Sequence, residues 1–340
     1  TSTSDLQAQM VRALRACSKA VSAVRPSARS LFLPAQYNEP KLVEVEVVPS
    51  PPVSSAFADP RAACPRFPNL RRIRPDSKIM RSSCPTNCPP EEVGALREVL
   101  GVRSLVDLRT ADERYSDAVG AHLWDQVVRV RKGEQQQQKT LNSSSTVTLY
   151  NVPLYTTTHI MRWVLQNAPV YEKPALLPGL VHIAGVSRPS PQALKAYNMS
   201  LSRHGLIGHN MFLLTRCGEQ ISAVLQLMCD EANLPMLFFC SLGKDRTGVI
   251  SMLALHCAGA ERGEIRRDFG ASWDGLKDIR DRLHARLTTG GLDPEEFLSA
   301  KESLVDEMFD FLDQKYGGAD AYLDAIGFDS TWRKRLRDVI

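Results

Sequence analysis

The sequence has no long apolar run, no dense cysteine pattern and no strong excess of charge. Its 340 residues carry 42 Lys and Arg against 38 Asp and Glu, and the net charge of +4 is too small to indicate a nucleic-acid partner. The longer apolar stretches, such as Val249 to Ala260, stop well short of the roughly 18 residues that a membrane-spanning helix requires. With 43% hydrophobic and 24% charged residues, the chain has a globular composition and no expected transmembrane segment.

The eight cysteines lack the close, regular spacing of a disulfide-stabilised secreted domain. This predicts free thiols in an intracellular, reducing compartment, the cytoplasm in the simplest case. Cys84 and Cys88, in CPTNC, are the closest pair, but no neighbouring His or Cys completes the ligand set of a metal site. We interpret them as a loop pair and expect neither a metal ion nor another cofactor.

Residues 1–60 are interpreted as a basic, proline-rich extension ahead of the folded domain. From Leu6 to Gln36 there is no acidic residue, and Arg and Lys are interleaved with Ala, Ser and Val. This composition is typical of an organelle-targeting peptide, and equally of an amphipathic surface helix or a disordered basic tail. The prolines and the alternating run KLVEVEVV, residues 41–48, then predict a linker with one edge strand.

Residues 61–340 are predicted to form one domain, with folded structure beginning near Cys64. A polar low-complexity insert, GEQQQQKTLNSSS at 133–145, has no apolar face to bury and is expected to be a loop. The runs on either side, LWDQVVRVR and TVTLYNVPLY, are rich in β-forming residues and predict two strands. The proline-rich segment from Gln166 to Gln192 is predicted to be irregular.

Strand and helix patterns alternate along this domain. A helix over residues 89–101 precedes a buried strand at Ser104 to Leu108. An amphipathic helix over Arg216 to Ala232 precedes the strand Met236 to Cys240, and the apolar segment Thr247 to Ala258 follows as a buried helix. Towards the C-terminus helical patterns dominate. We therefore predict an α/β fold in which helices flank a central, mostly parallel sheet, with a helical C-terminal part.

The segment FFCSLGKDRTG, Phe238 to Gly248, lies between this buried strand and this buried helix. A strand, a tight loop and a helix N-terminus direct several backbone N–H groups and the positive end of the helix dipole at one point, which makes an anion-binding cradle. Cys240 opens the loop, where this field favours the nucleophilic thiolate. Arg246 is placed to hold two phosphate oxygens in a bidentate fork.

The remaining loop residues fit the same chemistry. Gly243 lets the backbone turn closely, and Thr247 can offer its hydroxyl group to the sulfur. The pattern predicts a metal-independent phosphomonoester hydrolase that forms a cysteinyl-phosphate. A buried strand-end cysteine beside a surface arginine is the alternative, but of the eight cysteines only Cys240 has Arg six positions later. A Walker-type nucleotide loop is excluded, because Lys244 is followed by Asp245 rather than by Ser or Thr.

The CSLGKDRTG loop resembles the signature of the cysteine-dependent tyrosine phosphatase superfamily, in the form found in its atypical branch of tyrosine and phosphoinositide phosphatases. Three other stretches are similar to elements of that branch, in the expected order: KIMRSS at 78–83, SLVDLRTADE at 104–113, and YGGADAYLDAIGFDSTWRKRLRD at 316–338. The resemblance covers residues 69–338, with a weak middle. It implies a tyrosine-phosphatase-like fold, with Cys240 as nucleophile and Arg246 as phosphate clamp.

The resemblance also implies the rest of the site. Thr247 would assist breakdown of the intermediate. The backbone of Ser241 to Asp245 would form the cradle, and the residues predicted to contact phosphate are Ser241, Leu242, Gly243, Lys244 and Gly248. The expected substrate is a phosphoprotein, with phosphotyrosine as the first choice and a phosphoinositide as the alternative. The sequence leaves the oligomeric state open.

Two departures from the superfamily pattern leave alternatives. Phe239 stands where His is usual, so a weakened relative that only binds phosphate is a second interpretation. The segment His204 to Arg216 contains no acidic residue where typical members carry a general acid. Asp245 is then the best-placed carboxyl group, either as the acid or as a group that holds the loop shape through its amides, with Asp107 as a distant substitute.

The other polar residues have plainer interpretations. Lys244 is interpreted as a solvated lysine in preference to a contact for an inositol head group. Asp107, Arg109 and Glu113 are predicted to form an ion pair at the strand end in preference to a catalytic group. Six histidines are scattered singly and are attributed to packing or to the surface: His122, His159, His182, His204, His209 and His284.

Overall fold

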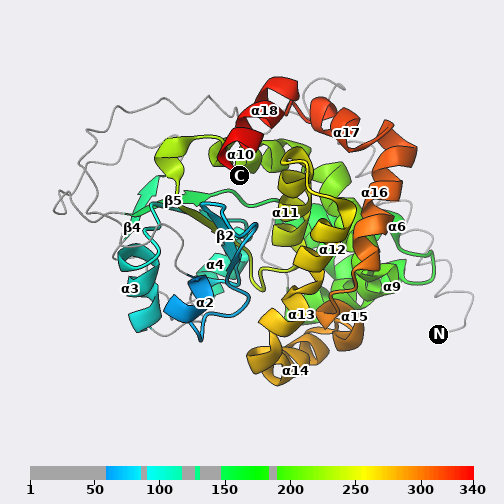
Figure 1. The fold of residues 1–340 in the computed structure, drawn as a ribbon. Coiled ribbons are helices and arrows are strands. Elements are labelled where there is room, and N and C mark those ends of the chain that lie inside the picture. Colours follow the sequence, from blue (N-terminus) through cyan, green and yellow to red (C-terminus); the bar gives the residue numbers. More distant parts are fainter. Residues whose placement is uncertain (1–58, 86–89, 117–126, 131–146, 184–189) are drawn as a thin grey trace, which may run out of the picture. The chain divides into compact units, whose positions relative to one another are not determined.

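The computed structural model describes residues 59–85, 90–116, 127–130, 147–183 and 190–340 (Figure 1). Nearly all of the predicted N-terminal extension, its edge strand, Cys88 and the polar insert lie outside the described residues. The two strands predicted on either side of the insert are confirmed by β4, Val127–Val130, and β5, Val147–Asn151. Within the described ranges, none of the helices has the length and apolar character needed to cross a membrane.

A six-stranded sheet forms the centre of the fold, in the order β1-β2-β6-β3-β5-β4. The remaining strands are β1 (Arg71–Arg72), β2 (Ile79–Ser82), β3 (Ser104–Asp107) and β6 (Met236–Phe239). Only β1 pairs antiparallel with its neighbour, and the other pairs are parallel, so the predicted mostly parallel sheet is confirmed. In the central part of the sheet, Phe239 is level with Ser82 on one side and with Asp107 on the other.

Helices surround this sheet and make up the C-terminal part, as predicted. The first group is α2 (Pro60–Ala63), α3 (Pro90–Glu98), α4 (Ala111–Ser116), α6 (Thr157–Asn167), α7 (Lys173–Leu176), η3 (Leu177–Gly179), α8 (Leu180–Ile183), α9 (Pro191–Arg216), α10 (Gly218–Met228), η4 (Glu231–Asn233) and α11 (Asp245–Cys257). The second is α12 (Arg262–Gly270), α13 (Ser272–Gly275), η5 (Lys277–Ile279), α14 (Arg280–Gly290), α15 (Pro294–Leu298), α16 (Ser303–Tyr316), α17 (Ala319–Ala325) and α18 (Ser330–Val339).

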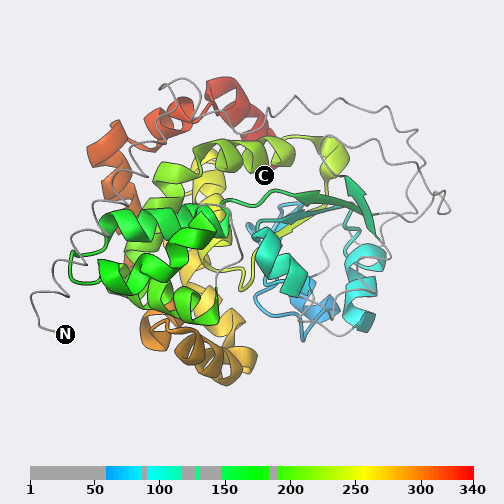
Figure 2. The same ribbon diagram turned by 180° about the vertical axis from the view of Figure 1, so that it is seen from behind.

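The sheet has a hydrophobic core on each face, and the side chains of β6 alternate between them. Met236, Phe238 and Cys240 belong to the larger core, which the main group of helices covers. Leu237 and Phe239 belong to the smaller core beneath α2 and α3. Figures 1 and 2 show α2 and α3 on one side of the sheet and α9, α11 and α16 on the other. The strand therefore turns Cys240 and Phe239 to opposite faces.

The segment predicted to be irregular is more helical than expected. It contains α7, η3 and α8, and it ends where the long helix α9 begins. The Ser190 side chain caps α9 through the amide of Ala193, and Pro191 occupies the first turn, a start signal that is present in the sequence. Gly205, with φ 64°, kinks the helix and interrupts the apolar periodicity by which a continuous helix is recognised.

Candidate active site

The loop after β6 places Cys240 at the carboxyl end of a central strand. The ends of three parallel strands lie level here, because Phe239 is in register with Ser82 of β2 and Asp107 of β3. Helix α11 begins at Asp245, directly after the loop. In α/β folds ligands bind at this edge of the sheet, so the sequence-predicted cradle lies where the topology favours a site.

The loop carbonyls are held from behind by neighbouring donors. The Asn69 side-chain amide donates to the carbonyl oxygens of Leu242 and Gly243, both at 2.9 Å. Arg81 Nη2 donates to the Gly243 oxygen at 2.7 Å. With these carbonyl groups turned outward, the amide groups of the same peptides point to the inner side of the loop. Within the described ranges no hydrogen bond uses the amides of residues 241–245, so they are available to an anion.

Gly243 is required by the shape of the loop. Its φ of +65° lies in the left-handed region that side chains disfavour. A Cβ atom at this position would lie 2.1 Å from the backbone oxygen of Ser82, the last residue of β2. The loop passes this close to the strand because no side chain stands between them.

A buried ion network supports the donors behind the loop. Arg81 is 0% exposed and pairs with Asp268 of α12, and Asp268 also accepts a hydrogen bond from Arg71 Nε at 2.9 Å. Burial raises the pKa of the Asp268 carboxyl group, but the charges of Arg81 and Arg71 outweigh this effect and lower it. The carboxylate therefore stays ionised and fixes Arg81 against the loop.

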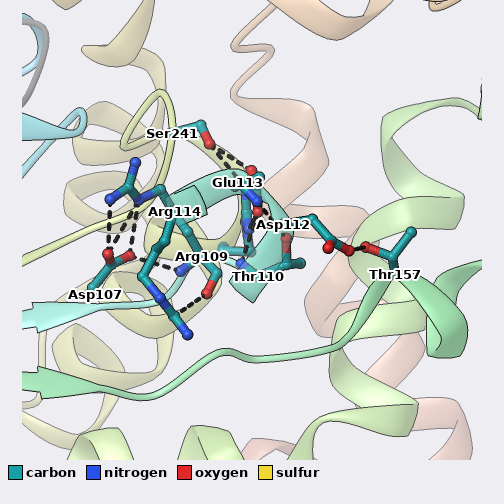
Figure 3. A network of polar contacts seen from close by, with 9 residues as sticks. Asp107, Arg109, Thr110, Asp112, Glu113, Arg114, Thr157 and Ser241 are labelled. Carbon is teal, nitrogen blue, oxygen red and sulfur yellow. Dashed lines mark hydrogen bonds and ion pairs between the residues drawn. The ribbon is translucent and has the colours of Figure 1, made fainter. Parts of the chain in front are cut away.

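Glu113 of α4 lies opposite the predicted phosphate clamp and binds it. Arg246 Nη1 is 2.6 Å from Glu113 Oε2, and Nη2 is 2.7 Å from Oε1. The Ser241 hydroxyl group donates to Glu113 Oε1 at 2.5 Å. Figure 3 shows the contact between these two side chains. Burial raises the pKa of Glu113, but the charge and hydrogen bonds of Arg246 and the hydrogen bonds of Ser241 and Thr110 lower it well below its usual range.

The same carboxylate also begins helix α4. The Thr110 amide donates to Glu113 Oε2 at 2.8 Å, and the Glu113 amide donates to Thr110 Oγ1 at 3.2 Å. This reciprocal pair is a capping box, and the sequence TADE at residues 110–113 has the pattern typical of one. Our prediction that Glu113 joins Asp107 and Arg109 in one ion pair is therefore wrong, because the cap turns its side chain towards Arg246.

Asp107 and Arg109 do form the predicted ion pair at the end of β3. Arg109 Nη2 lies 2.8 Å from Asp107 Oδ2, and Asp107 is 0% exposed. Asp107 is therefore unsuited to be the substitute acid, since Arg109 also binds Oδ1, through Nε at 3.0 Å. The Arg109 guanidinium lies 5.6 Å from the centre of the Phe239 ring, which faces the smaller core.

Tyr155 is a site residue that the sequence did not reveal. It follows β5, and its ring centre lies 5.4 Å from the Arg246 guanidinium carbon. The face of an aromatic ring attracts a cation, so Tyr155 and Glu113 together orient Arg246. No local pattern marks this position, because the two residues meet only through the tertiary fold.

Lys244 and Asp245 pair with each other. Lys244 is 0% exposed, and its Nζ atom lies 2.6 Å from Asp245 Oδ1. The interpretation of Lys244 as a solvated lysine is therefore wrong, because the folded domain buries its side chain completely. The Asp245 side chain is 17% exposed. Within the described residues it pairs with Lys244 and does not accept the hydrogen bonds from the loop amides that the alternative in which Asp245 holds the loop shape requires.

Three other predicted residues have distinct positions. Cys240 is 3% exposed, at the base of the cradle. Thr247 is fully buried in the first turn of α11, but its Oγ1 atom has no hydrogen-bond partner among the residues described, so the expected contact with the sulfur is not made here. The Gly248 amide donates to the Lys244 oxygen at 2.8 Å inside the first helical turn. Gly248 is thus not a phosphate contact in this arrangement, and its lack of a side chain admits the Phe269 ring.

In the part of the chain that the structure describes, the side chains around the loop do not form a metal-ligand cluster. Among the residues described, no three His, Cys, Asp or Glu side chains gather as metal ligands would. The two carboxylates that face the loop residues, those of Glu113 and Asp245, each bind a cationic side chain.

Comparison with known proteins identifies the family of this chain. A model of the tyrosine phosphatase family matches residues 67–340. The triple specificity protein phosphatase PtpB of Mycobacterium tuberculosis is 29% identical over 147 residues, which is 37% of this chain and 51% of that protein. A tyrosine-protein phosphatase of Nostoc commune is 31% identical over 129 residues, which is 35% of this chain and 43% of that protein. The chain spans about half the length of these curated relatives.

One solved structure that matches is the core catalytic domain of the PP-IP phosphatase SIW14 from S. cerevisiae in complex with citrate. It is 15% identical, with a TM-score of 0.30, over 65% of this chain and 93% of that chain. The family assignment rests on the family model, which extends from ahead of β1 to the C-terminal helix α18. The chain belongs to the tyrosine phosphatase family.

Proposed function

We propose that this chain is a cysteine-dependent phosphatase that hydrolyses phosphomonoesters of proteins, phosphotyrosine above all, through a cysteinyl-phosphate. The observation that carries the proposal is the polarity of the loop after β6. Asn69 and Arg81 bind its carbonyl oxygens from behind, which leaves its amides directed to the side where Cys240 lies. Amides that are fixed before the substrate arrives stabilise the charge of a phosphoryl group without reorganising.

The proposed reaction has two steps. The Cys240 thiolate attacks phosphorus, the bond from phosphorus to the ester oxygen breaks, and that oxygen takes a proton as it leaves. Water then attacks the cysteinyl-phosphate, loses a proton, and releases inorganic phosphate while the thiolate is restored. The loop amides and Arg246 hold the equatorial oxygens in both steps, and Thr247 is proposed to turn its free hydroxyl group towards the sulfur during the second.

Arg246 contributes a charge that is already oriented. A guanidinium group has five N–H donors, and Glu113 accepts two of them. The ion pair with Glu113 and the Tyr155 ring hold the group in the direction of the loop. We propose that the remaining donors bind phosphate, and that Glu113 keeps the clamp in place without contacting the substrate.

Asp245 is proposed to take part in protonating the leaving group. It is the first residue of α11 and, unlike Asp107, has a partly exposed carboxylate. The alternative is that Asp245 serves only to bind Lys244. Asp245→Asn should slow a poor leaving group, such as an alkyl phosphate, much more than an activated nitrophenyl ester. An equal loss on both would assign Asp245 to the scaffold.

A phosphoinositide is the second candidate substrate, and the burial of Lys244 beside the loop favours it. A buried ammonium group acts on a cradle more strongly than a solvated one does, and the Asp245 carboxylate offsets part of its charge. The matching protein of Mycobacterium tuberculosis is named a triple specificity phosphatase, which is consistent with a range of phosphoesters. A panel of soluble inositol lipids and phosphopeptides separates the two candidates by kcat/KM.

The binding-only interpretation is motivated by Phe239. Its side chain enters the smaller core, on the face of β6 opposite to Cys240. The ring therefore lies apart from the loop donors, which remain in place. We accordingly favour turnover over binding alone.

The test of the function is turnover of an aryl phosphate with EDTA and a thiol reductant present. Cys240→Ser should abolish turnover and retain binding of tungstate, an oxyanion of the size of phosphate. Cys257→Ser is the matched control, since Cys257 is also a buried cysteine of the larger core but lies at the far end of α11. Turnover that survives Cys240→Ser would overturn the mechanism, and tungstate binding without turnover in the unmodified protein would support the binding-only interpretation.

A further inference from the structure

His209, on α9, lies beside the candidate active site in a closely packed aromatic group. It is 7% exposed. The Tyr155 ring meets it edge to face, with centroids 6.0 Å apart and planes at 89°, and the Phe212 ring lies nearly parallel to it at 6.5 Å and 20°. Tyr155 also carries Arg246 over its ring. A single aromatic ring thus contacts both His209 and the phosphate clamp.

Charged groups of the site act on His209. The charged groups that act on its ring are Asp245, Arg246 and Lys244 from the loop and α11, and Glu113 from α4. Its Nδ1 atom is buried without a hydrogen-bond partner among the residues described. Buried polar atoms are normally paired, so an imidazole nitrogen left open next to an anion cradle indicates a partner that comes with the ligand.

We propose that His209 is a catalytic residue that donates the proton to the leaving oxygen of the bound phosphomonoester, and that Asp245 acts through it. This inference rests on the proposed phosphatase function. It accounts for two observations together: the absence of an acid in the segment 204–216, and the ion pair that engages Asp245 with Lys244. The pair makes Asp245 a fixed negative charge that stabilises a protonated imidazole.

The charge state of His209 is suited to this role only when substrate is present. Burial lowers the pKa of His209 to about 4; Asp245 and Glu113 oppose this effect, whereas Arg246 and Lys244 add to it. The ring is therefore neutral in the ligand-free protein at neutral pH. A phosphomonoester adds up to two negative charges, which offset Arg246 and Lys244 and favour the imidazolium. Because the second pKa of such a group is about 6, the ester can also bring the proton with it.

Protons balance over the two steps. In the first, Cys240 Sγ bonds to phosphorus, the ester bond breaks, and the imidazolium proton of His209 moves to the departing oxygen, which leaves His209 neutral. In the second, the attacking water gives its proton to the neutral imidazole while the bond from sulfur to phosphorus breaks. The released phosphate and the alcohol or phenol account for all atoms, and no oxidant or reductant is needed.

The test compares His209→Gln with the unmodified protein on esters of increasing leaving-group pKa. Glutamine is similar in size and polarity but cannot carry the proton. We expect kcat on tyrosyl and alkyl phosphates to fall about 10²-fold, and kcat on an activated nitrophenyl ester to fall no more than about threefold. Adding Asp245→Asn to His209→Gln should cost little more, because Asp245 acts through the ring. Equal losses on both kinds of ester would overturn the inference.

His204→Gln is the matched control. His204 lies on the same helix and also has a buried, unpartnered ring nitrogen, but it packs against Trp163, at 5.0 Å, rather than against Tyr155. It should leave the dependence on the leaving group unchanged. If it changes that dependence as His209→Gln does, the effect comes from the packing of α9 and the inference fails.

A binding measurement makes the test independent of variants at His209. Calorimetry of tungstate binding to Cys240→Ser, in two buffers of different ionisation enthalpy, should detect uptake of a proton near pH 7. Binding without proton uptake would overturn the inference and leave the phosphatase function untouched. Turnover of aryl phosphate that does not depend on Cys240 would overturn the phosphatase function, and the inference with it.

Discussion

The two sides of the loop after β6 differ in how fully their polar groups are bonded. On the side that faces the protein, the carbonyl oxygens of Leu242 and Gly243 accept hydrogen bonds from Asn69 and Arg81, and Asp268 fixes Arg81 in turn. On the side that faces the predicted substrate, Thr247 Oγ1 and the amides of residues 241–245 have no partner among the residues described. The hydrogen bonds behind the loop hold its shape and leave the amides on the other side open.

This contrast has an energetic meaning. A buried polar group without a partner costs about 1–3 kcal/mol, so several open donors in one loop would deform it unless the rest were held firmly. The donors behind the loop supply that resistance. Substitutions behind the loop should therefore lower stability and activity together, whereas substitutions on the open side should affect activity with smaller effects on stability.

The largest effect is expected for Gly243→Ala, which affects both sides at once. The new Cβ atom would meet the backbone of Ser82, and the positive φ would be strained as well. We expect turnover of nitrophenyl phosphate to fall by at least about 10³-fold and the free energy of unfolding to fall by roughly 3 kcal/mol. Gly259→Ala is a matched control, because Gly259 also has a positive φ but open space around it. Near-normal turnover in Gly243→Ala would contradict the close contact with β2.

Asp268→Asn should be the most damaging change confined to the protein side. It leaves Arg81 and Arg71 buried without a counter-charge, and breaking such a buried pair typically costs about 3–5 kcal/mol in urea unfolding. The partly exposed pair of Asp306 with Arg266 provides the control, since Asp306→Asn should cost less than about 1 kcal/mol. If the two variants are equally stable, the ion network does not support the loop.

The next effect concerns His209 and the dependence of the free energy of unfolding on pH. The lowered pKa of His209, about 4, compares with about 6.5 in an unfolded chain, so the unfolded state binds the proton first as the pH falls. The contribution is complete above pH 6.5 and is lost as the pH drops from there to about 4, by up to roughly 3 kcal/mol. His209→Gln should flatten the stability curve in this window, measured by urea unfolding at a series of pH values. An unchanged slope would contradict the burial of a neutral ring.

The smallest effect is expected for Glu113→Gln. Glutamine can still form the capping box with Thr110, so α4 should keep its start, but the charged pair with Arg246 is lost. We expect kcat/KM to fall about tenfold, with a rise in KM, because Arg246 is less firmly oriented. Thr110→Ala is the complementary variant: it removes one half of the cap and keeps the charged pair. A larger loss of turnover in Thr110→Ala than in Glu113→Gln would show that the cap matters more than the charge.

The sequence was sufficient where neighbouring residues determine the structure. The strand before Cys240, the helix after it and the mostly parallel sheet follow from local apolar patterns, and the structure confirms them. Gly243 was expected in a close turn, and it lies in one. The order of the loop residues alone thus located the candidate site.

The sequence was insufficient where distant segments meet. Glu113 and Arg246 are 133 positions apart, and nothing local indicates that they bind each other. The burial of Lys244 and the position of His209 beside Tyr155 depend on how segments far apart in the sequence pack together. The kink at Gly205 hides this helix from a periodicity search, and single histidines give no pattern at all. Charged residues in an enclosed site therefore need the fold before their roles can be assigned.

Glu113 joins two events that are usually separate: the fraying of a helix end and the release of Arg246, the side chain proposed to bind phosphate. Oε2 of its carboxylate accepts both the Thr110 amide and Arg246 Nη1, so neither contact can open widely without disturbing the other. Local opening of α4 would release Arg246 from Glu113. Conversely, an oxyanion that binds Arg246 would weaken the contact of Arg246 with Glu113 and so change the stability of the helix end. The exchange rate of the Thr110 amide hydrogen is thus a local reporter of whether the cradle is occupied.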